Sequence, residues 1–175
     1  MKKDLTIAFV LMSLGILTRL IPHGWNMTLM GAVALIAGFL ISRKSIAVLV
    51  PLVAVIISDL FLGFHSTIYY VYGAYIAMVA LTSSVGQSRW GTVLATSTLG
   101  SFLFFIITNF GVWYVEGIYP HTFSGLMQSY MMGLPFYRAQ FLMDVVGSFG
   151  LVYGFRFLFK KVLRQTPSVK ELSRG

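Results

Sequence analysis

The sequence predicts an all-α integral membrane protein, a bundle of six transmembrane helices that forms one domain over residues 1–175. Hydrophobic residues make up 57% of the chain and charged residues 10%, whereas a soluble chain has roughly a quarter charged residues. The mean hydropathy of +0.82 agrees with lipid as the main surrounding solvent. This composition excludes a cytosolic enzyme and a disordered tail, and the lack of cysteine excludes a secreted disulfide scaffold.

Six apolar runs are long enough to cross a membrane, since a hydrocarbon core of ~30 Å takes about 20 helical residues. The predicted helices cover about 4–21, 26–42, 45–62, 67–87, 90–109 and 138–159, with an outer loop at 110–137 and a cytoplasmic tail at 160–175. The first run is not expected to be a signal peptide, because no small-residue cleavage site follows it.

The basic residues predict the orientation of these helices. Of the 13 Lys and Arg residues, eleven fall on one side of a six-helix topology, and only Arg19 and Arg138 fall on the other. Lys and Arg concentrate in cytoplasmic loops, so both termini are expected in the cytoplasm and the protein in the cytoplasmic (inner) membrane. The net charge of +8 is therefore interpreted as a topology signal. No nucleic-acid partner is predicted, because the cations form no basic stripe.

The remaining polar residues gather on the predicted outer side, which holds all three histidines and three of the five acids. Aromatic residues are also more frequent there. An interfacial aromatic belt explains some of them, but the asymmetry favours an aromatic-lined cavity for a small molecule. The candidate ligand-binding residues are Arg19, His23, Trp25, Asn26, Asp59, His65, Tyr69, Tyr72, Asn109, Trp113, Tyr119, His121, Tyr130, Arg138 and Asp144.

Two acids within the predicted helices need an explanation, because a charge at the centre of a membrane helix costs about 2.5–3.5 kcal/mol. Asp59 and Arg19 lie near the outer ends of their helices, at matching depth. They are expected to form an ion pair that ties helix ends together, or one that also shapes a pocket. Asp144 lies about two turns into the last predicted helix. It is expected to pair with another helix or with loop amides, or else to contact a ligand.

The third outer connection, 110–137, is long, apolar and rich in Gly, Tyr and Met, and it contains Pro120 and Pro135. Within it, the stretch Phe123–Met132 is compatible with a short helix lying in the interface. A segment this apolar is not expected to extend freely into water. We expect it to fold over the outer mouth as a lid or to pack into the bundle.

Motifs for catalysis and for metal binding are missing. The three histidines are single and have no His-Glu-x-x-His spacing, so no metal site is predicted. No lysine follows a glycine, which excludes a phosphate-binding loop. The one serine between glycines, Ser148, lies far from every histidine in the predicted topology. The sequence thus predicts neither catalytic residues nor a resident cofactor, and hence no enzyme.

Several motifs resemble a family of small bacterial six-helix membrane proteins. They are Arg19–Asn26, Gly31–Gly38, Ser58–His65, Thr108–Trp113, Tyr119–Thr122 and Leu134–Phe136. That family is similar to the substrate-binding S components of energy-coupling-factor vitamin transporters, especially the solitary S-component-like proteins linked to cobalamin uptake. The resemblance covers most of the chain, from about Arg19 to Asp144.

The resemblance implies a vitamin-like ligand, with cobalamin or a related corrinoid first, bound in an outer pocket under the three outer loops. It also implies docking, through small residues of the first helix, onto an energy-coupling membrane subunit with ATPases. Here that helix offers Ala8, Ser13 and Gly15, but Met12 stands four residues after Ala8, where a small residue would be needed. Solitary action and a different partner both stay open.

A second hypothesis is a structural or assembly membrane protein that contacts other membrane subunits and binds no small ligand. The two hypotheses differ in what they predict for the outer polar residues. A ligand receptor should have them line a cavity of several hundred Å³, whereas a scaffold should have them pair with one another or lie exposed.

Overall fold

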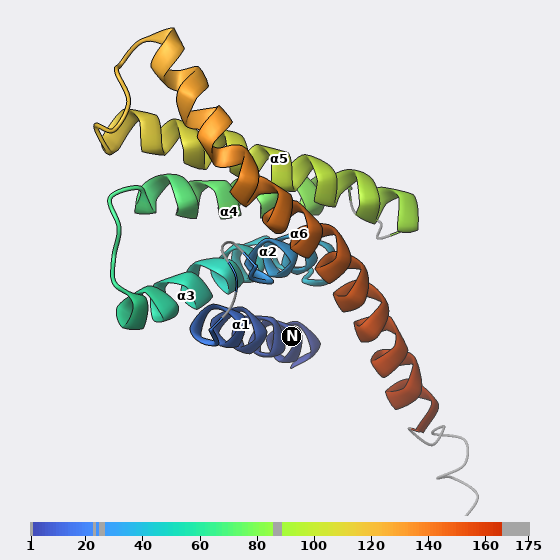
Figure 1. The fold of residues 1–175 in the computed structure, drawn as a ribbon. Coiled ribbons are helices and arrows are strands. Elements are labelled where there is room, and N and C mark those ends of the chain that lie inside the picture. Colours follow the sequence, from blue (N-terminus) through green and yellow to red (C-terminus); the bar gives the residue numbers. More distant parts are fainter. Residues whose placement is uncertain (1, 23, 25–26, 86–88, 166–175) are drawn as a thin grey trace, which may run out of the picture.

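The computed structural model describes residues 2–22, 24, 27–85 and 89–165, with the backbone alone for 2 and 159–165. This part of the chain forms six α-helices and no strand, which confirms the all-helical prediction (Figure 1). The helices are α1 (Lys2–Leu20), α2 (Met30–Leu40), α3 (Lys44–Leu62), α4 (Ile68–Val85), α5 (Trp90–Val115) and α6 (Phe123–Gln165).

Four of the helices are long and apolar enough to cross a membrane: α3, α4, α5 and the part of α6 that runs from Phe123 to Leu158. These spans support a membrane protein. The other two helices differ in kind. α2 has 11 residues, so it covers about half of a hydrocarbon core. α1 has 19 residues but carries charges near both ends, including Asp4 and Arg19. Six membrane crossings therefore remain a prediction.

The short helix α2 forms the centre of the bundle. Its residues from Met30 to Gly38 are all buried, and it contacts each of the other five helices (Figure 1). A helix that is apolar on every face belongs inside a protein. A helix too short to span is tolerated at membrane depth when protein surrounds it. The placement of α2 therefore agrees with its composition.

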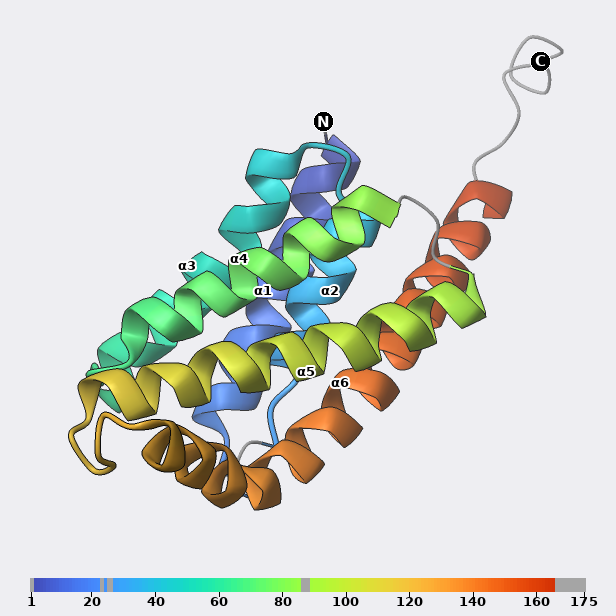
Figure 2. The same cartoon turned by 90° about the horizontal axis from the view of Figure 1, so that it is seen from above.

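Successive helices form hairpins, which sorts the connections into two groups. The α1–α2, α3–α4 and α5–α6 connections lie at one end of the bundle, called the site end below (Figure 2). The start of α1, the end of α6, the α2–α3 connection, the end of α4 and the start of α5 lie at the opposite end, together with Lys3, Arg43, Lys44 and Arg89. The charge asymmetry that predicts the orientation is therefore present in the fold.

The predicted loop at 110–137 is wrong in its extent. α5 continues to Val115 and α6 begins at Phe123, so only residues 116–122 connect them. Helix 123–132 exists, but it runs on through Pro135 into the last helix. Figure 2 shows α6 changing direction along its length, as expected where proline removes a helical hydrogen bond. Asp144 therefore lies about six turns from the start of its helix.

The reason for the longer hairpin lies in contacts between its two arms. The Ser129 hydroxyl donates to the Asn109 carbonyl at 2.8 Å, and the Tyr130 hydroxyl donates to the Ile106 carbonyl at 3.3 Å. The Phe105 ring packs against Tyr130, with ring centroids 5.8 Å apart. These contacts hold residues 105–130 in a helical hairpin. The predicted tail at 160–175 also begins as helix, because α6 reaches Gln165.

Candidate functional site

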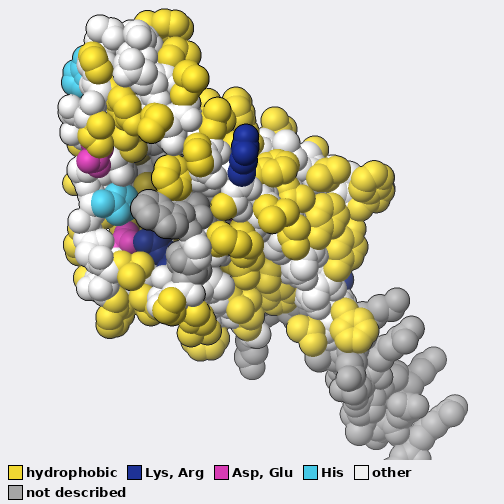
Figure 3. Space-filling model, viewed as in Figure 1, with side chains coloured by type: hydrophobic (Ala, Val, Ile, Leu, Met, Phe, Trp, Pro, Cys, Tyr) yellow, Lys and Arg dark blue, Asp and Glu magenta, His cyan; other side chains and the backbone are white. Residues whose placement is uncertain are grey.

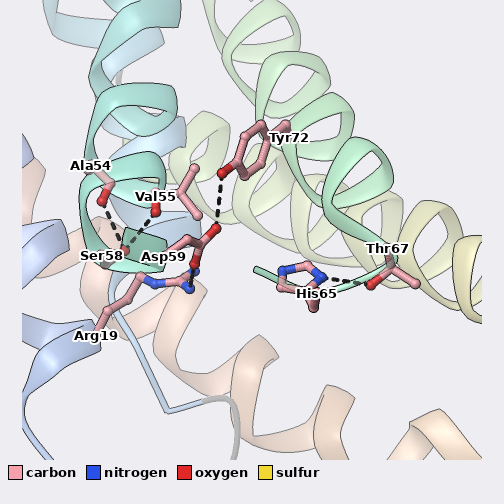
Figure 4. A network of polar contacts seen from close by, with 8 residues as sticks. All are labelled: Arg19, Ala54, Val55, Ser58, Asp59, His65, Thr67 and Tyr72. Carbon is pink, nitrogen blue, oxygen red and sulfur yellow. Dashed lines mark hydrogen bonds and ion pairs between the residues drawn. The ribbon is translucent and has the colours of Figure 1, made fainter. Parts of the chain in front are cut away.

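An ion pair joins three helices at the site end. The Arg19 guanidinium of α1 pairs with the Asp59 carboxylate of α3, and the Tyr72 hydroxyl of α4 donates to the other Asp59 oxygen at 3.0 Å (Figure 4). Asp59 is buried, with 1% of its surface exposed. The ion pair expected from the matching depth of Arg19 and Asp59 is therefore confirmed, and Tyr72 completes it.

A cavity of about 330 Å³, called the central cavity below, lies beside this ion pair. All six helices contribute to its wall, together with the α1–α2 and α3–α4 connections. The lining residues are Arg19, Thr28, Gly31, Leu62, His65, Val71, Tyr75, Phe104, Thr108, Gln140 and Asp144. Its wall therefore combines aromatic and aliphatic groups with a few polar ones, which is the usual composition of a small-molecule site.

Asp144 is the acidic group in the wall of the central cavity, and it is 1% exposed. Its Oδ2 accepts a hydrogen bond from Gln140 Nε2 at 3.3 Å. Its Oδ1 makes no close hydrogen bond among the described residues, although the Ser101 hydroxyl of α5, which is also buried without a close partner, lies near the carboxylate. This oxygen lies against Gly31 of α2, where a Cβ atom would collide with it. The glycine thus makes room for the carboxylate at the cavity wall.

A second cavity of about 430 Å³, called the hairpin cavity, lies between α5, the first part of α6 and their connection. Its lining residues are Phe105, Thr108, Asn109, Val112, Tyr119, Ser129, Met132, Gly133, Phe136, Tyr137 and Gln140. Thr108 and Gln140 line both cavities. The two cavities are therefore neighbours, separated in part by these side chains.

Aromatic contacts hold the α5–α6 connection in place. The Trp113 indole N–H donates to the Pro120 carbonyl at 2.9 Å. The His121 ring packs against Trp113 and stacks on Tyr114, with centroid distances of 5.4 and 6.1 Å. The Ser66 hydroxyl donates to the Glu116 carboxylate, which joins this connection to the one between α3 and α4. The expected lid is thus a short connection held by several contacts.

Figure 3 shows where the polar side chains gather on one face. Histidine and acidic side chains and one basic side chain lie at the site end, on the left of this view, whereas hydrophobic side chains cover much of the rest of the described surface and a second basic side chain lies near its middle. His65 belongs to this group, and its Nδ1 shares a hydrogen bond with the Thr67 hydroxyl at 3.0 Å (Figure 4). A polar end on an otherwise apolar body suits a protein embedded in lipid.

The structure sorts the predicted site residues into groups. Arg19, His65 and Asp144 line the central cavity, and Asn109 and Tyr119 line the hairpin cavity. Residues that support the fold around these cavities are Asp59, Tyr72, Trp113, His121 and Tyr130.

The other predicted residues do not join the cavities. Tyr69 is 84% exposed and Arg138 is exposed, and neither lines either of the two described cavities. His23, Trp25 and Asn26 lie outside the described residues.

Sequence reasoning missed several residues of the central cavity. Gln140 precedes Asp144 by four residues, which places both on one face of a helix, so this spacing is a usable signal. Gly31, Tyr75 and Phe104 carry no comparable signal, because each stands in an ordinary apolar helix. Their position in the wall follows from how α2, α4 and α5 pack.

The predicted docking residues of α1 need a correction. Ala8 is 3% exposed and belongs to the hydrophobic core. A Cβ atom on Gly15 would meet Met30 and Ala54, so this glycine also faces into the bundle. Ser13 alone of the three is partly exposed. The small residues Ala8 and Gly15 serve close packing within the chain, so neither is placed to meet a partner.

The fold and the site define a helical bundle with candidate membrane spans and a cavity lined by polar and aromatic groups. The chain belongs to the family described as a family of unknown function, DUF6580, whose model matches residues 1–168. Comparison with curated proteins and with solved structures found no match. No group of three or more His, Asp or Glu side chains suited to a metal ion occurs within the described residues.

Proposed function

We propose that this protein is a substrate-binding membrane transport protein that takes up a small, vitamin-like molecule through the central cavity. The observation that carries the proposal is a cavity of about 330 Å³ whose wall draws on all six helices and includes Arg19 and Asp144. Small-molecule sites have volumes of about 300–1,000 Å³ and a small number of placed polar groups. A site built from every helix is also sensitive to helix movement, which transport requires.

The orientation of the charges supports uptake from outside the cell. Lys3, Arg43, Lys44 and Arg89 lie at the end opposite the site, and Lys and Arg favour the cytoplasmic side of a membrane. In a cytoplasmic (inner) membrane the site end would then face outward. The resemblance to S components, whose ligand pocket lies on the outer side, agrees with this arrangement.

The volume of the cavity favours a ligand smaller than a corrinoid. About 330 Å³ lies at the lower end of the range for drug-sized ligands. Cobalamin, the ligand that the resemblance implies first, is much larger than such ligands and would leave most of its volume outside. The volume of the central cavity on its own therefore favours a compact member of the vitamin-like class.

Energy coupling would involve a surface other than the predicted one. The resemblance implies a membrane subunit with ATPases, but Ala8 and Gly15 are buried. The three most exposed apolar side chains of α1 are Leu5, Phe9 and Leu17, and their four- and eight-residue spacing places them on one side of the helix. A partner on α1 would meet this stripe, which otherwise faces lipid. We propose no catalytic activity.

A structural protein without a ligand is the alternative. Its support is the pairing of Arg19 with Asp59 and Tyr72, since these polar groups satisfy one another. The central cavity and the unpaired Asp144 oxygen are not needed by a scaffold, so we place this hypothesis second.

Binding to the purified protein tests the proposal. The protein in detergent would be incubated with thiamine, pyridoxamine, pyridoxine, riboflavin, pantothenate, biotin and cobalamin, and retained molecules identified by native mass spectrometry. We expect micromolar or tighter binding of at least one. Thr108→Phe, which fills the cavity, should abolish that binding, and Leu99→Phe at an exposed position of the same helix should keep it. Retention of no molecule by the wild-type protein would overturn the proposal.

A further inference from the structure

The Asp144 carboxylate is buried but incompletely satisfied. It is 1% exposed, one oxygen accepts from Gln140, and the other makes no close hydrogen bond among the described residues. A buried acceptor without a hydrogen bond is unfavourable, and more so when it is charged. A carboxylate within a membrane helix that also lines a cavity therefore has a strong need for a donor.

The surroundings of Asp144 indicate where that donor would come from. On the α2 side the carboxylate lies against Gly31, which has no side chain to offer. On the α6 side Gln140 already donates to Oδ2. On the α5 side the buried Ser101 hydroxyl lies near the carboxylate, but it is neutral and makes no close hydrogen bond to Oδ1. Both Asp144 and Gly31 line the central cavity. A molecule inside this cavity is thus placed to reach the unpaired oxygen.

We propose that Asp144 selects the ligand, and that the ligand presents to it an ammonium group or another positively charged nitrogen that carries hydrogen. This inference rests on the proposed function and narrows its substrate class to cationic amines. An ammonium supplies both the hydrogen bond and the opposite charge that a buried carboxylate needs. A neutral hydroxyl would supply the hydrogen bond alone.

The rest of the wall sets two more features of the ligand. Tyr75 and Phe104 add aromatic surface, which suits a ring. The charge of Arg19 is balanced by Asp59, and the Tyr75 hydroxyl also lies within hydrogen-bonding reach of Arg19, so this arginine does not require an anion from the ligand. The fitting molecule is a compact ring compound with an ammonium group and no anionic group.

The closest matched probes are pyridoxamine and pyridoxine, which share a ring and differ by an aminomethyl and a hydroxymethyl group. Their dissociation constants for the wild-type protein would be measured by calorimetry. We expect pyridoxamine to bind about ten- to a hundredfold more tightly, from the usual value of a hydrogen bond to a charged group. Asp144→Asn should remove this difference. Ser148→Ala, one turn away and in the wall of neither described cavity, should keep it.

The vitamin mixture separates this inference from the proposed function. Retention of pyridoxamine, the ammonium compound of the mixture, by the wild-type protein, and its loss in Asp144→Asn, would support both. Equal or tighter binding of a neutral or anionic member, such as pyridoxine or biotin, would overturn the inference and leave the proposed function standing. Retention of nothing would overturn both. The ranking of cationic, neutral and anionic probes needs only the wild-type protein, so it decides even if Asp144→Asn does not fold.

Discussion

Asp59 and Asp144 are the same residue type with the same 1% exposure, yet their surroundings differ. Both oxygens of Asp59 have partners, Arg19 on one and Tyr72 on the other. Asp144 has Gln140 on one oxygen, no close hydrogen bond on the other, and the neutral Ser101 hydroxyl nearby. Burial is therefore no guide to the role of a carboxylate in this bundle. The charge of Asp59 is balanced within the fold, whereas Asp144 lines the central cavity with only neutral groups beside it.

The two positions also differ in what packs around them. Asp59 lies in the last turn of α3, where α1 and α4 each bring a polar side chain to it. Asp144 faces the central helix α2, whose buried residues from Met30 to Gly38 include no charged side chain. Polar side chains of α1 and α4 therefore act as partners for the Asp59 carboxylate within the protein. The helix that faces Asp144 offers no such side chain, so a partner for its charge has to come from the cavity.

Asp59→Asn should give the largest loss of stability. It removes the charge partner of Arg19, and breaking a buried ion pair costs about 3–5 kcal/mol. Thermal unfolding in detergent would measure this loss. Tyr72→Phe is the matched control, because it removes one hydrogen bond and should cost about 1 kcal/mol. Equal stability of Asp59→Asn and the wild-type protein would show that the pair is unimportant for the fold.

Gly31→Ala should come next, because it brings a methyl group against the other carboxylate. The new Cβ would collide with Asp144 Oδ1, and overpacking of a buried site costs about 1–3 kcal/mol. Gly150→Ala is the control, since nothing lies within 4 Å of the Cβ added there. The double variant Gly31→Ala with Asp144→Ala should recover stability lost in Gly31→Ala. Additive effects in this cycle would contradict the contact.

The contrast between the two acids also marks what the sequence can predict. Arg19 and Asp59 stand near the ends of clear apolar runs, so their common depth follows from counting residues. The partners of Asp144 depend on the register between α6 and α2, which brings Gly31 under the carboxylate. Neither helix carries a sequence signal for that register, because glycine in an apolar run is compatible with many packings.

The same reasoning explains the hairpin at residues 105–130. The sequence allows a short helix at Phe123–Met132 but does not predict that it continues into the last helix or that α5 extends to Val115, since Pro120, Pro135 and many glycines indicate a loop. Tertiary contacts between the arms, such as Ser129 with the Asn109 carbonyl, favour helix there. Pro135 is accommodated within α6. Where two helices pack against each other, the tertiary contacts outweigh the low helix propensity of proline and glycine.

Trp113→Phe should have a smaller effect than either variant above. It removes the hydrogen bond to the Pro120 carbonyl, worth about 0.5–1.5 kcal/mol, and the phenyl ring keeps part of the contact with His121. Ligand affinity should change little, because Trp113 does not line either described cavity. Trp90→Phe, 68% exposed at the other end of α5, is the control for loss of an indole. A large loss of affinity in Trp113→Phe alone would place the indole at the ligand.

Asp144→Asn should have the smallest effect on stability, within about 1 kcal/mol of the wild-type protein or above it. The substitution keeps an oxygen that accepts from Gln140 and removes a buried charge that forms no ion pair among the described residues. A loss as large as that of Asp59→Asn, in the same unfolding experiment without ligand, would mean that Asp144 has a structural partner. An Asp144→Asn variant that is stable but binds pyridoxamine weakly would show that the two acids have different roles. Asp59 would then contribute free energy to the fold, and Asp144 would contribute it only when a ligand fills the cavity.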